Sequence, residues 1–503
     1  MKGNAFLFSS LFVNLCLIIS QTDIEKMQSF DLSASERLKL FEFTLDKLEK
    51  YYSETKSFRV SPELNKAQIS DEARKVDFSN PLPAERAIGH LIDGMESYSV
   101  HTPHSKYFGL FNPRPNFPSI LGDLITAVFN PQLAAWSHSP FANEIENYLI
   151  SEFGKKFGYP EKSIDGVFAS GGAEANLTAV LCAVNHAFPK FAKSGWFGIS
   201  TRPVLYCSEE SHHSVHKAAK TVGLGYDAIR SIPVRQDLKM DVEILNQTIH
   251  DDIQNGLLPF LVIGTAGTTG TGAIDDLLGI RKIADEFGLW FHIDAAYGGA
   301  AVLNPDLKHY LNGISFSDSI TFDAHKWLSI TMGTSLFITR HKEILSKTFR
   351  ITAEYMPKEA KDMGIVDPFT HSIQWSRKAY GIKLYLALMM FGWRGYEEVI
   401  GYQTAIGESL KEKLLKSRWK VMNNSPFPVV CFTDEKHLDD PQFTNSIVKG
   451  ILESGKSWLS VYPIFGKPTF RACITNYNTT KKDINDFVEE LNAWRERFER
   501  IEK

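Results

Sequence analysis

A lysine and an aspartate in the middle of the chain have the chemistry and the spacing of a cofactor site. Asp294 directly follows the apolar run 290–293, and Lys326 comes 32 residues later in the segment Asp-Ala-His-Lys-Trp, residues 323–327. A lysine amine forms an imine with an aldehyde, and a carboxylate keeps the nitrogen of a pyridine ring protonated so that the ring withdraws electrons. Pyridoxal phosphate (PLP) requires both groups. The pair therefore predicts a PLP site, with Lys326 as the imine-forming residue and Asp294 beside the ring nitrogen.

Three further segments, each after a strand-like run, carry residues suited to the same ligand. Residues 170–176 (SGGAEAN) open a helical run, so their backbone amides can bind a phosphate, although such a turn alone is more often plain packing. His212, in SHHSV at 211–215, can stack on the cofactor ring, although adjacent histidines on a loop, read alone, are more often solvated residues or an incidental metal site. Residues 264–272 offer hydroxyls and amides, or form a flexible turn. These segments become specific evidence for a PLP site only in combination with Asp294 and Lys326.

One motif points to a different ligand and fails on its context. Residues 450–457 (GILESGKS) satisfy the nucleotide-binding pattern GxxxxGK[ST], which needs a strand before it and a helix after it. Here a helical stripe precedes the motif and the strand-like run 458–461 follows it. Gly455 is better explained as the cap that ends a helix.

The elements that position these residues alternate between strand-like and helical runs. Such alternation predicts an α/β fold with a mostly parallel central sheet flanked by helices. Ligands of such sheets bind at the carboxyl ends of the strands, and both Asp294 and Lys326 follow strand runs. The predicted strands are 166–169, 204–207, 260–264, 290–293, 319–322 and 335–338.

The ends of the chain read as separate parts. An amphipathic helix is expected from Ser33 to Tyr52, and the proline-rich stretch 111–118 is expected as a loop. After a long helix at 377–399, short strands at 429–431, 458–462 and 470–474 alternate with helices, and Thr480 caps a last helix through Asn492. The predicted domains are a helical N-terminal arm (21–110), a large PLP-binding domain (111–395) and a smaller C-terminal α+β domain (396–503).

The composition is typical of a soluble globular protein with a small-molecule ligand. The chain has 503 residues, of which 43% are hydrophobic and 23% charged, and its net charge is -4. Such a balance creates no field that attracts nucleic acid or an anionic membrane, so neither is expected as a partner. Five dispersed cysteines without metal-ligand spacing predict reduced structural thiols and no metal site.

Residues 1–20 mimic a secretion signal. The apolar run 5–19 follows Lys2 but is short for a membrane span, which leaves a cleaved signal, a hydrophobic extension or a misplaced start as alternatives. The glycosylation sequon at Asn176 falls inside the predicted phosphate-binding turn, where a glycan would not fit. We therefore expect a cytoplasmic protein, with secretion as the minority alternative.

Taken in chain order, five segments resemble the motifs of the group II PLP-dependent amino-acid decarboxylases, the family of aromatic-amino-acid, histidine and glutamate decarboxylases. The resemblance runs from about residue 30 to the C-terminus, and the last two motifs in tandem are the specific ones. It implies the fold type I of the PLP-dependent transferases, which is aspartate-aminotransferase-like, and a homodimer in which both subunits line each site. The segments are SGGAEAN (170–176), SEESHHSV (208–215), GTTGTG (267–272), HIDAAYGG (292–299) and DAHKW (323–327).

The resemblance also implies roles for single residues. His212 would stack on the cofactor ring, and Ala296 would pack under it. Thr269 would lie near the Asp294 end of the cofactor. The phosphate would be held by Gly172, Ala173 and His325.

By the same resemblance, the reaction is the decarboxylation of an L-amino acid to an amine and carbon dioxide. The substrate amine would displace Lys326, and the ring would hold the released electrons as a quinonoid. Many family members then use a loop tyrosine as the acid. The segment 356–373 contains no tyrosine: Phe369 lies near the aligned position, and His371 is the alternative acid. Phenylalanine there is associated with aldehyde production or cofactor loss in some members.

Substrate choice and the alternatives to decarboxylation stay open. Phe111 falls where the family's substrate pocket begins and would favour an apolar or aromatic group. Arg114 either pairs with an acidic side chain or is a solvated loop residue. The alternative functions are an aldehyde synthase that couples decarboxylation to oxidative deamination, a carbon–carbon lyase on the same fold, and a non-catalytic scaffold, against which Lys326 and Asp294 argue.

Overall fold

The computed structural model describes residues 30–351 and 365–501. These residues form two compact units: 30–58 with Pro62–Val100, and Arg59–Ser61 with 101–351 and 365–501. The predicted signal at residues 1–20 lies outside the described residues. No helix within the described ranges is long and apolar enough to cross a membrane.

The first unit consists of helices, as predicted for the N-terminal arm. It contains α3 (Ala34–Glu54), α4 (Lys66–Arg74) and α5 (Ala84–Tyr98). Ser33 starts α3 with a full capping box, in which its hydroxyl accepts from the Glu36 amide and the Glu36 carboxylate accepts from the Ser33 amide. Although α3 is amphipathic, none of its residues is buried.

The second unit is built on a seven-stranded sheet, in the order β1-β7-β6-β5-β4-β2-β3. The five strands from β6 to β3 run parallel, whereas β7 runs antiparallel to both β6 and β1. The mostly parallel sheet that the sequence predicts is therefore confirmed. Its strands are β1 (Asp165–Ala169), β2 (Pro203–Ser208), β3 (Ile229–Ile232), β4 (Leu258–Thr265), β5 (Trp290–Asp294), β6 (Ser319–Asp323) and β7 (Ser335–Thr339).

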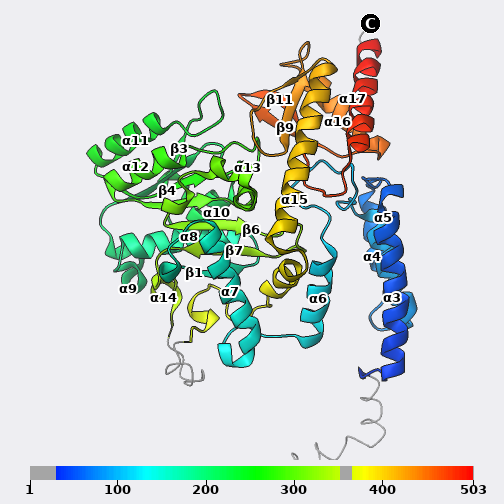
Figure 1. The fold of residues 1–503 in the computed structure, drawn as a ribbon, viewed down its shortest axis with the longest axis horizontal. Coiled ribbons are helices and arrows are strands. Elements are labelled where there is room, and N and C mark those ends of the chain that lie inside the picture. The colour runs from blue at the N-terminus through cyan, green and yellow to red at the C-terminus, as the bar shows by residue number, and fades with distance from the viewer. Residues whose placement is uncertain (1–29, 352–364, 502–503) are drawn as a thin grey trace, which may run out of the picture. The chain divides into compact units, whose positions relative to one another are not determined.

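Helices cover both faces of this sheet because the strands are apolar on both sides (Figure 1). On β2, Val204 and Tyr206 face one buried cluster, and Leu205 and Cys207 face the other. The first cluster includes residues of α7 (Pro140–Lys156), α11 (Val242–Gln254) and α12 (Leu277–Phe287). The second includes residues of α8 (Gly172–Ala187), α10 (Ser214–Thr221) and α14 (Ile344–Phe349).

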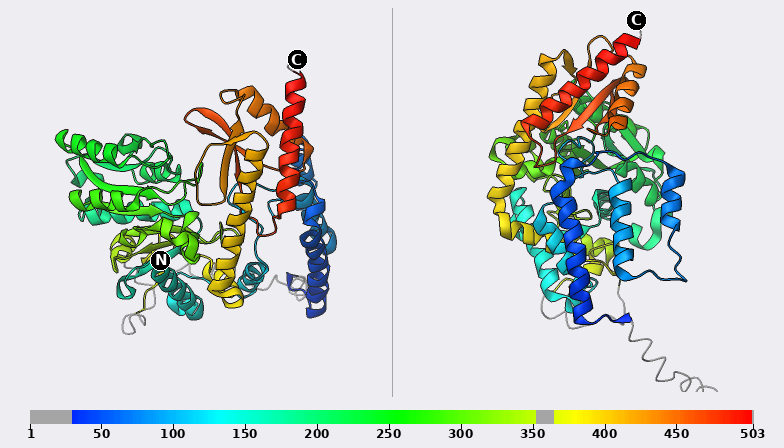
Figure 2. Two further views of the ribbon diagram at one scale, coloured as in Figure 1. Left: turned by 45° about the horizontal axis from the view of Figure 1, so that its top comes forward. Right: turned by 90° about the vertical axis from the view of Figure 1, so that its right-hand side faces the viewer.

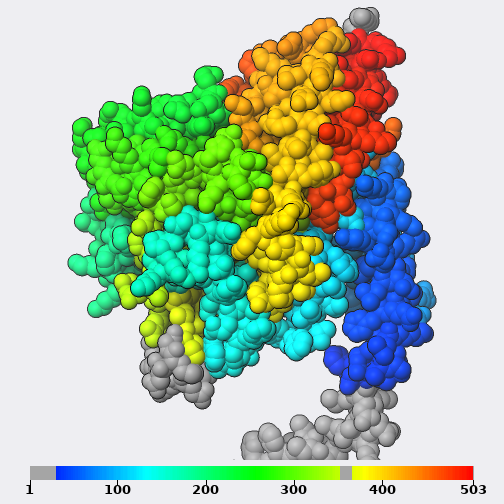
Figure 3. Space-filling view, in the orientation of Figure 1, coloured from blue at the N-terminus to red at the C-terminus, as the bar shows by residue number. Residues whose placement is uncertain are grey.

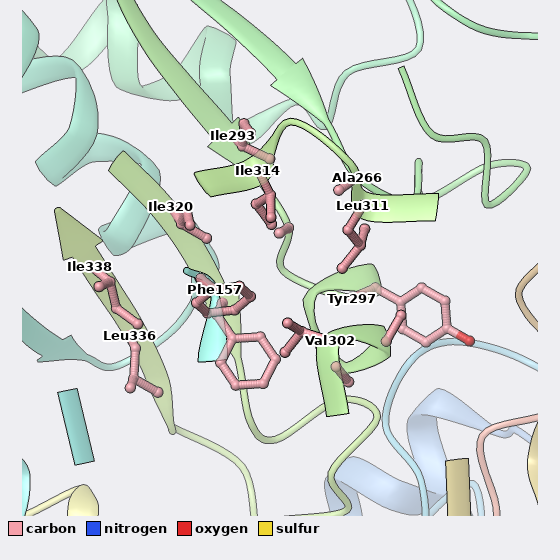
Figure 4. Close-up of a cluster of buried hydrophobic side chains, with 14 of the residues drawn as sticks. Phe157, Ala266, Ile293, Tyr297, Val302, Leu311, Ile314, Ile320, Leu336 and Ile338 are labelled. Carbon is pink, nitrogen blue, oxygen red and sulfur yellow. The ribbon is translucent and has the colours of Figure 1, made fainter. Parts of the chain in front are cut away.

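Figure 4 shows part of the first cluster, where side chains from neighbouring strands meet. Ile293, Ile320 and Ile338 project from β5, β6 and β7 toward Phe157 and the segment Gly298–Leu303 that follows β5. This packing fixes the carboxyl ends of β5 and β6, from which the predicted site residues extend.

A second, four-stranded antiparallel sheet has the order β10-β11-β9-β8. Its strands are β8 (Trp419–Val421), β9 (Val429–Asp434), β10 (Ser460–Ile464) and β11 (Lys467–Cys473), with helices α16 (Pro441–Ser454) and α17 (Lys481–Ile501) packed together beside them (Figure 2). The long α15 (Gly381–Lys416) contacts both α7 and α17 along the surface in Figure 3. The predicted domain boundary at 395/396 falls inside α15 and stays a prediction.

Several local predictions have a direct outcome. Gly455 ends α16 in the left-handed conformation with φ of 69°, so the nucleotide-binding interpretation of 450–457 is excluded by its helix-before, strand-after context. Thr480 precedes α17 and exchanges hydrogen bonds with Asp483, as expected of a cap. The proline-rich stretch is not all loop, because α6 (Phe117–Phe129) already begins at Phe117, and a proline is tolerated in a first turn.

The cysteines of the described chain are unpaired. Cys182, Cys207, Cys431 and Cys473 are free and buried, which agrees with structural thiols; Cys16 lies outside the described residues. The remaining short helices are α9 (Phe191–Ser194) and α13 (Pro305–Lys308).

Candidate active site

A cavity of about 280 Å³ lies at the carboxyl ends of β4, β5 and β6. All eight residues that the sequence assigns to cofactor binding line it, although they come from five separate segments. The carboxyl edge of a parallel sheet is where such segments converge. The eight are Gly172, Ala173, His212, Thr269, Asp294, Ala296, His325 and Lys326, and Gly171, Asn176, Thr265, Gly267, Tyr297 and Asp323 complete the lining.

Lys326 forms an ion pair with a carboxylate that carries no predicted role. Its Nζ lies 3.0 Å from Asp323 Oδ2 at the end of β6. The other oxygen, Oδ1, accepts a hydrogen bond of 2.6 Å from the Ser335 hydroxyl on the neighbouring β7. Asp323 is only 2% exposed, so the amine of Lys326 is held by a carboxylate that is itself fixed.

Asp294 is held by two hydrogen bonds at the end of β5. Asn176 Nδ2 donates to its Oδ2 at 2.8 Å, and the Ala296 amide donates to its Oδ1 at 3.1 Å. Asn176 Oδ1 in turn lies 3.1 Å from Nε2 of the buried His292. Burial lowers the pKa of His292 to about 4, so this histidine is neutral at physiological pH.

His212 lines the cavity just before α10. Its Nδ1 lies 2.8 Å from Ser214 Oγ and 3.2 Å from the Ser214 amide. Burial lowers the pKa of His212 below its ordinary value, and the nearby Asp294 carboxylate opposes this only in part. The side chain is therefore a neutral, flat ring in the cavity wall.

The first turn of α8 meets the end of β6 at the cavity. A Cβ on Gly172 would lie 2.7 Å from Asp323 Oδ2, so only glycine permits this close approach. The first amides of a helix have no partner within the helix and favour an anion. His325 lies at the same place, where burial lowers its pKa and Asp323 partly restores it.

Phe111 and two further residues build an aromatic and cationic wall next to Lys326. The ring of Phe111 stacks on Tyr297 with a centroid distance of 3.9 Å, and Lys326 Nζ lies 5.8 Å from the Phe111 centroid. The guanidinium of Arg471, from β11, lies 5.0 Å from the same centroid. Arg471 is 3% exposed and donates to the carbonyls of Gly270 and Gly109.

The remaining predicted residues do not line this cavity. Arg114 is 6% exposed, so the interpretation of it as a solvated loop residue is wrong. Phe369 is buried against Trp375, with ring centroids 4.6 Å apart, and its amide bonds to the Ala134 carbonyl. His371 lines a separate hollow of about 320 Å³, where its Nε2 lies 3.5 Å from Asp165 Oδ2.

Sequence reasoning missed Asp323, Asn176 and Arg471. Asp323 and Asn176 belong to the motifs DAHKW and SGGAEAN, so the sequence could indicate that they lie at the site. It could not indicate which residues they bind. Arg471 carried no signal, because it reaches Gly109 across 362 residues of sequence.

Comparison with known proteins places this geometry in context. Residues 80–434 match the model of the pyridoxal-dependent decarboxylase conserved domain. The aromatic-L-amino-acid decarboxylase of Bacillus atrophaeus is 28% identical over 474 residues, which cover 93% of this chain and 97% of that protein. The 4-hydroxyphenylacetaldehyde synthase of Rhodiola rosea is 28% identical over 445 residues, 87% of this chain and 88% of that protein.

A solved structure shares the fold. The structure of Oryza sativa TDC with PLP and tryptamine superimposes with a TM-score of 0.87 at 23% identity, and the match covers 93% of this chain and 99% of that one. The fold type I expected from the resemblance is confirmed.

Proposed function

Because the chain belongs to the pyridoxal-dependent decarboxylase family and is thus a PLP-dependent carboxy-lyase, we propose that it converts an L-amino acid into its amine and carbon dioxide. The observation that carries this proposal is the convergence of Lys326, Asp294 and His212 on one cavity. An amine, a carboxylate and a flat neutral ring are the three side chains that the cofactor needs around its aldehyde, its ring nitrogen and its face.

The residues present fit the cofactor. Lys326 would bind it covalently, Asp294 would hold its ring nitrogen, and the first turn of α8 with His325 would hold its phosphate. His212 and Ala296 would lie on the two faces of the ring, with Thr269 near the Asp294 end. When bound, PLP supplies an aldehyde that captures amines and a ring that withdraws electrons from the bond to be broken.

Asp323 has a proton-holding role in this proposal. Its Oδ2 lies 3.0 Å from Lys326 Nζ and keeps the ammonium beside the aldehyde's position. An amine must lose its proton before it can attack an aldehyde. Asp323 Oδ2 is the nearest carboxylate oxygen to which that proton can pass.

Arg471 is our candidate for holding the substrate's carboxylate. Among the described residues, its guanidinium donates to two backbone carbonyls and the Ser460 hydroxyl rather than to a carboxylate, and its buried Nη2 has no hydrogen-bond partner. A buried cation without a counter-ion is costly, so such a site favours an anionic ligand. The Tyr297 hydroxyl, also buried and without a partner in the described chain, is a second donor beside the same Phe111 ring.

The wall around Lys326 favours an aromatic or apolar substrate side chain. Phe111 and Tyr297 offer stacked rings there, which bind flat groups well. Arg114, a buried cation three residues after Phe111 in the sequence, keeps an acidic substrate as the alternative.

We further propose that the protein is a homodimer. Leu38, Phe41, Leu45 and Leu48 are spaced three or four residues apart, so they form one apolar face of α3. Each of these side chains is nevertheless between 45% and 68% exposed. A contiguous apolar stripe of this kind is usually covered by a partner. A second copy is the partner that the family resemblance suggests.

A cytoplasmic location is supported by the four free thiols of the described chain.

An aldehyde synthase is the second candidate. Within the described residues, Tyr297 is the only tyrosine of the cavity lining, and Phe369 lies near the position at which many family members have the tyrosine that acts as the acid. The similarity to the Rhodiola rosea synthase makes this outcome a concrete alternative. It differs from simple decarboxylation in consuming oxygen and releasing peroxide.

The test is to incubate PLP-loaded protein with the twenty amino acids, ornithine and 2,4-diaminobutyrate while measuring carbon dioxide, amine, aldehyde and peroxide together. Equal amounts of carbon dioxide and amine are expected. Carbon dioxide with peroxide and aldehyde would favour the second candidate. Lys326→Ala should abolish turnover, whereas Lys378→Ala, which removes a half-exposed lysine paired with Asp123, should not. Activity that survives Lys326→Ala would overturn both candidates.

A further inference from the structure

One buried amide links the residue proposed for the ring nitrogen of the cofactor to the residue proposed for one face of the ring. Asn176, on α8, is 2% exposed. Its Nδ2 lies 2.8 Å from Asp294 Oδ2 and 2.8 Å from Ser214 Oγ, and its Oδ1 lies 3.1 Å from His292 Nε2. Both of its hydrogens and its carbonyl are thus used inside the protein, and all three partners are buried.

The direction of these hydrogen bonds follows from the carboxylate. An ionised carboxylate only accepts, so the atom facing Asp294 is the donor Nδ2 and the atom facing His292 is the acceptor Oδ1. His292 must then donate from Nε2. Its Nδ1 accepts from the Ser319 hydroxyl at 2.9 Å, whose oxygen accepts from Trp290 Nε1 at 2.9 Å. The Thr321 hydroxyl oxygen lies 3.3 Å from the same Nε2 and can share its hydrogen, so this arrangement of protons satisfies the branch.

The second branch runs from Asn176 to the ring-stacking histidine. Because the Ser214 oxygen receives a hydrogen from Asn176, its own hydrogen is free for His212 Nδ1 at 2.8 Å. The Ser214 amide points at the same nitrogen from 3.2 Å. Two donors at Nδ1 leave no room for a proton there, so His212 is the tautomer protonated at Nε2.

We propose that Asn176 is a positioning residue that fixes the orientation of the Asp294 carboxylate and the tautomer of His212 together, so that the cofactor ring meets a hydrogen-bond acceptor at its nitrogen and an uncharged imidazole on its face. A charge-assisted hydrogen bond to a carboxylate is strong and directional, which suits this role. A protonated imidazole would repel the protonated ring. This inference rests on the proposed PLP site but not on any particular amino acid substrate.

The first test uses the native protein. Nitrogen-15 NMR of labelled histidines distinguishes a protonated from an unprotonated ring nitrogen, and the two signals are assigned with single-residue variants. His212 and His292 are both expected to be protonated at Nε2 alone. Protonation of either ring at Nδ1 would overturn the proposal, because the hydrogen-bond directions would then be reversed.

The second test removes the amide. Asn176→Ala should weaken PLP binding by about tenfold or more, the usual effect of losing a hydrogen bond to a charged group. It should also move the ring-nitrogen signal of nitrogen-15-labelled PLP toward the unprotonated form. The control is Asn185→Ala on the same helix, whose Nδ2 bonds only to the Leu181 carbonyl at 2.9 Å and which should leave both readouts unchanged. Affinity within twofold of wild type and an unchanged ring signal in Asn176→Ala would refute the role.

A pair of His292 variants covers the case in which Asn176→Ala does not fold. A glutamine amide reaches the position of Nε2, whereas an asparagine amide reaches that of Nδ1. His292→Gln should therefore keep PLP affinity closer to wild type than His292→Asn, and equal losses would contradict the relay. No experiment here includes an amino acid. A wild-type protein that binds PLP and decarboxylates nothing would refute the proposed function while leaving this inference intact.

Discussion

Lys326 and Asp323 form an ion pair of 3.0 Å across one turn of chain at the end of β6, between a lysine side chain that is 21% exposed and an aspartate side chain that is 2% exposed. The pair joins the nucleophile of the proposed reaction to the carboxylate that controls its proton. Ser335 on β7 donates a hydrogen bond to the other carboxylate oxygen of Asp323, so the neighbouring strand also holds this carboxylate in place.

Asp323→Asn should slow the capture of PLP by at least about tenfold, because the ammonium of Lys326 loses the carboxylate that holds it and takes its proton. Stopped-flow absorbance during PLP addition measures this rate. Ser335→Ala is the control, since it removes only the bond to the other oxygen and should have the smaller effect. Capture at the wild-type rate in Asp323→Asn would remove Asp323 from the mechanism.

Arg471→Met should raise KM for the amino acid by about tenfold or more and leave PLP affinity unchanged, because a charge-assisted hydrogen bond to the substrate is lost. Steady-state kinetics and a PLP titration measure the two effects. Arg497→Met, on the exposed side of α17, should change neither. A loss of PLP affinity equal to the rise in KM would instead indicate a structural role for Arg471.

His292 should make the protein less stable in mild acid. Burial lowers its pKa from 6.5 to about 4, so between these values the unfolded chain binds a proton that the folded chain does not. The free energy of unfolding therefore falls as the pH drops, by about 2 kcal/mol for this group between pH 7 and pH 5. Thermal melts across this range should show Tm falling less steeply in His292→Gln. An unchanged slope in that variant would mean that other groups carry the effect.

The loop acid can be located by two substitutions. Phe369 is buried against Trp375 and does not line the cavity of its own chain, so Phe369→Tyr should leave the ratio of amine to peroxide unchanged. Tyr355 directly precedes the segment 356–373, which contains no tyrosine, and it lies outside the described residues. Tyr355→Phe should shift the products toward aldehyde and peroxide. The opposite pattern would identify position 369 as the one that controls the product.

The apolar face of α3 should control assembly. Leu38→Glu combined with Leu45→Glu places two charges on a stripe that is 68% and 53% exposed at these positions, and should convert a dimer into a monomer. Light scattering during size-exclusion chromatography measures the mass. Leu415→Glu, at a residue 61% exposed on α15, is the matched control. A dimer that survives the double substitution would place the interface elsewhere.

Strands were predictable where buried apolar runs are bounded by turns. All six runs predicted for the large sheet are strands, because strands of a sheet that is covered on both faces are mostly apolar. The edge strand β3 (Ile229–Ile232) was missed, since it includes Arg230 and Ser231 and is buried fully only at its last residue. β8 (Trp419–Val421) was missed because three residues are too few to give a pattern.

The sequence by itself determined the chemistry of this protein: an aspartate at the end of one strand and a lysine just after the neighbouring parallel strand must meet at the carboxyl edge of the sheet. The tertiary structure alone decided which groups hold them. Asn176 reaches Asp294 across 118 residues, and Arg471 reaches Gly270 across 201. Whether two groups form a hydrogen bond depends on differences of a few tenths of an ångström in the distance between elements that are remote in sequence. No local sequence pattern encodes such differences. Motif order therefore predicted the site, and packing set its proton arrangement.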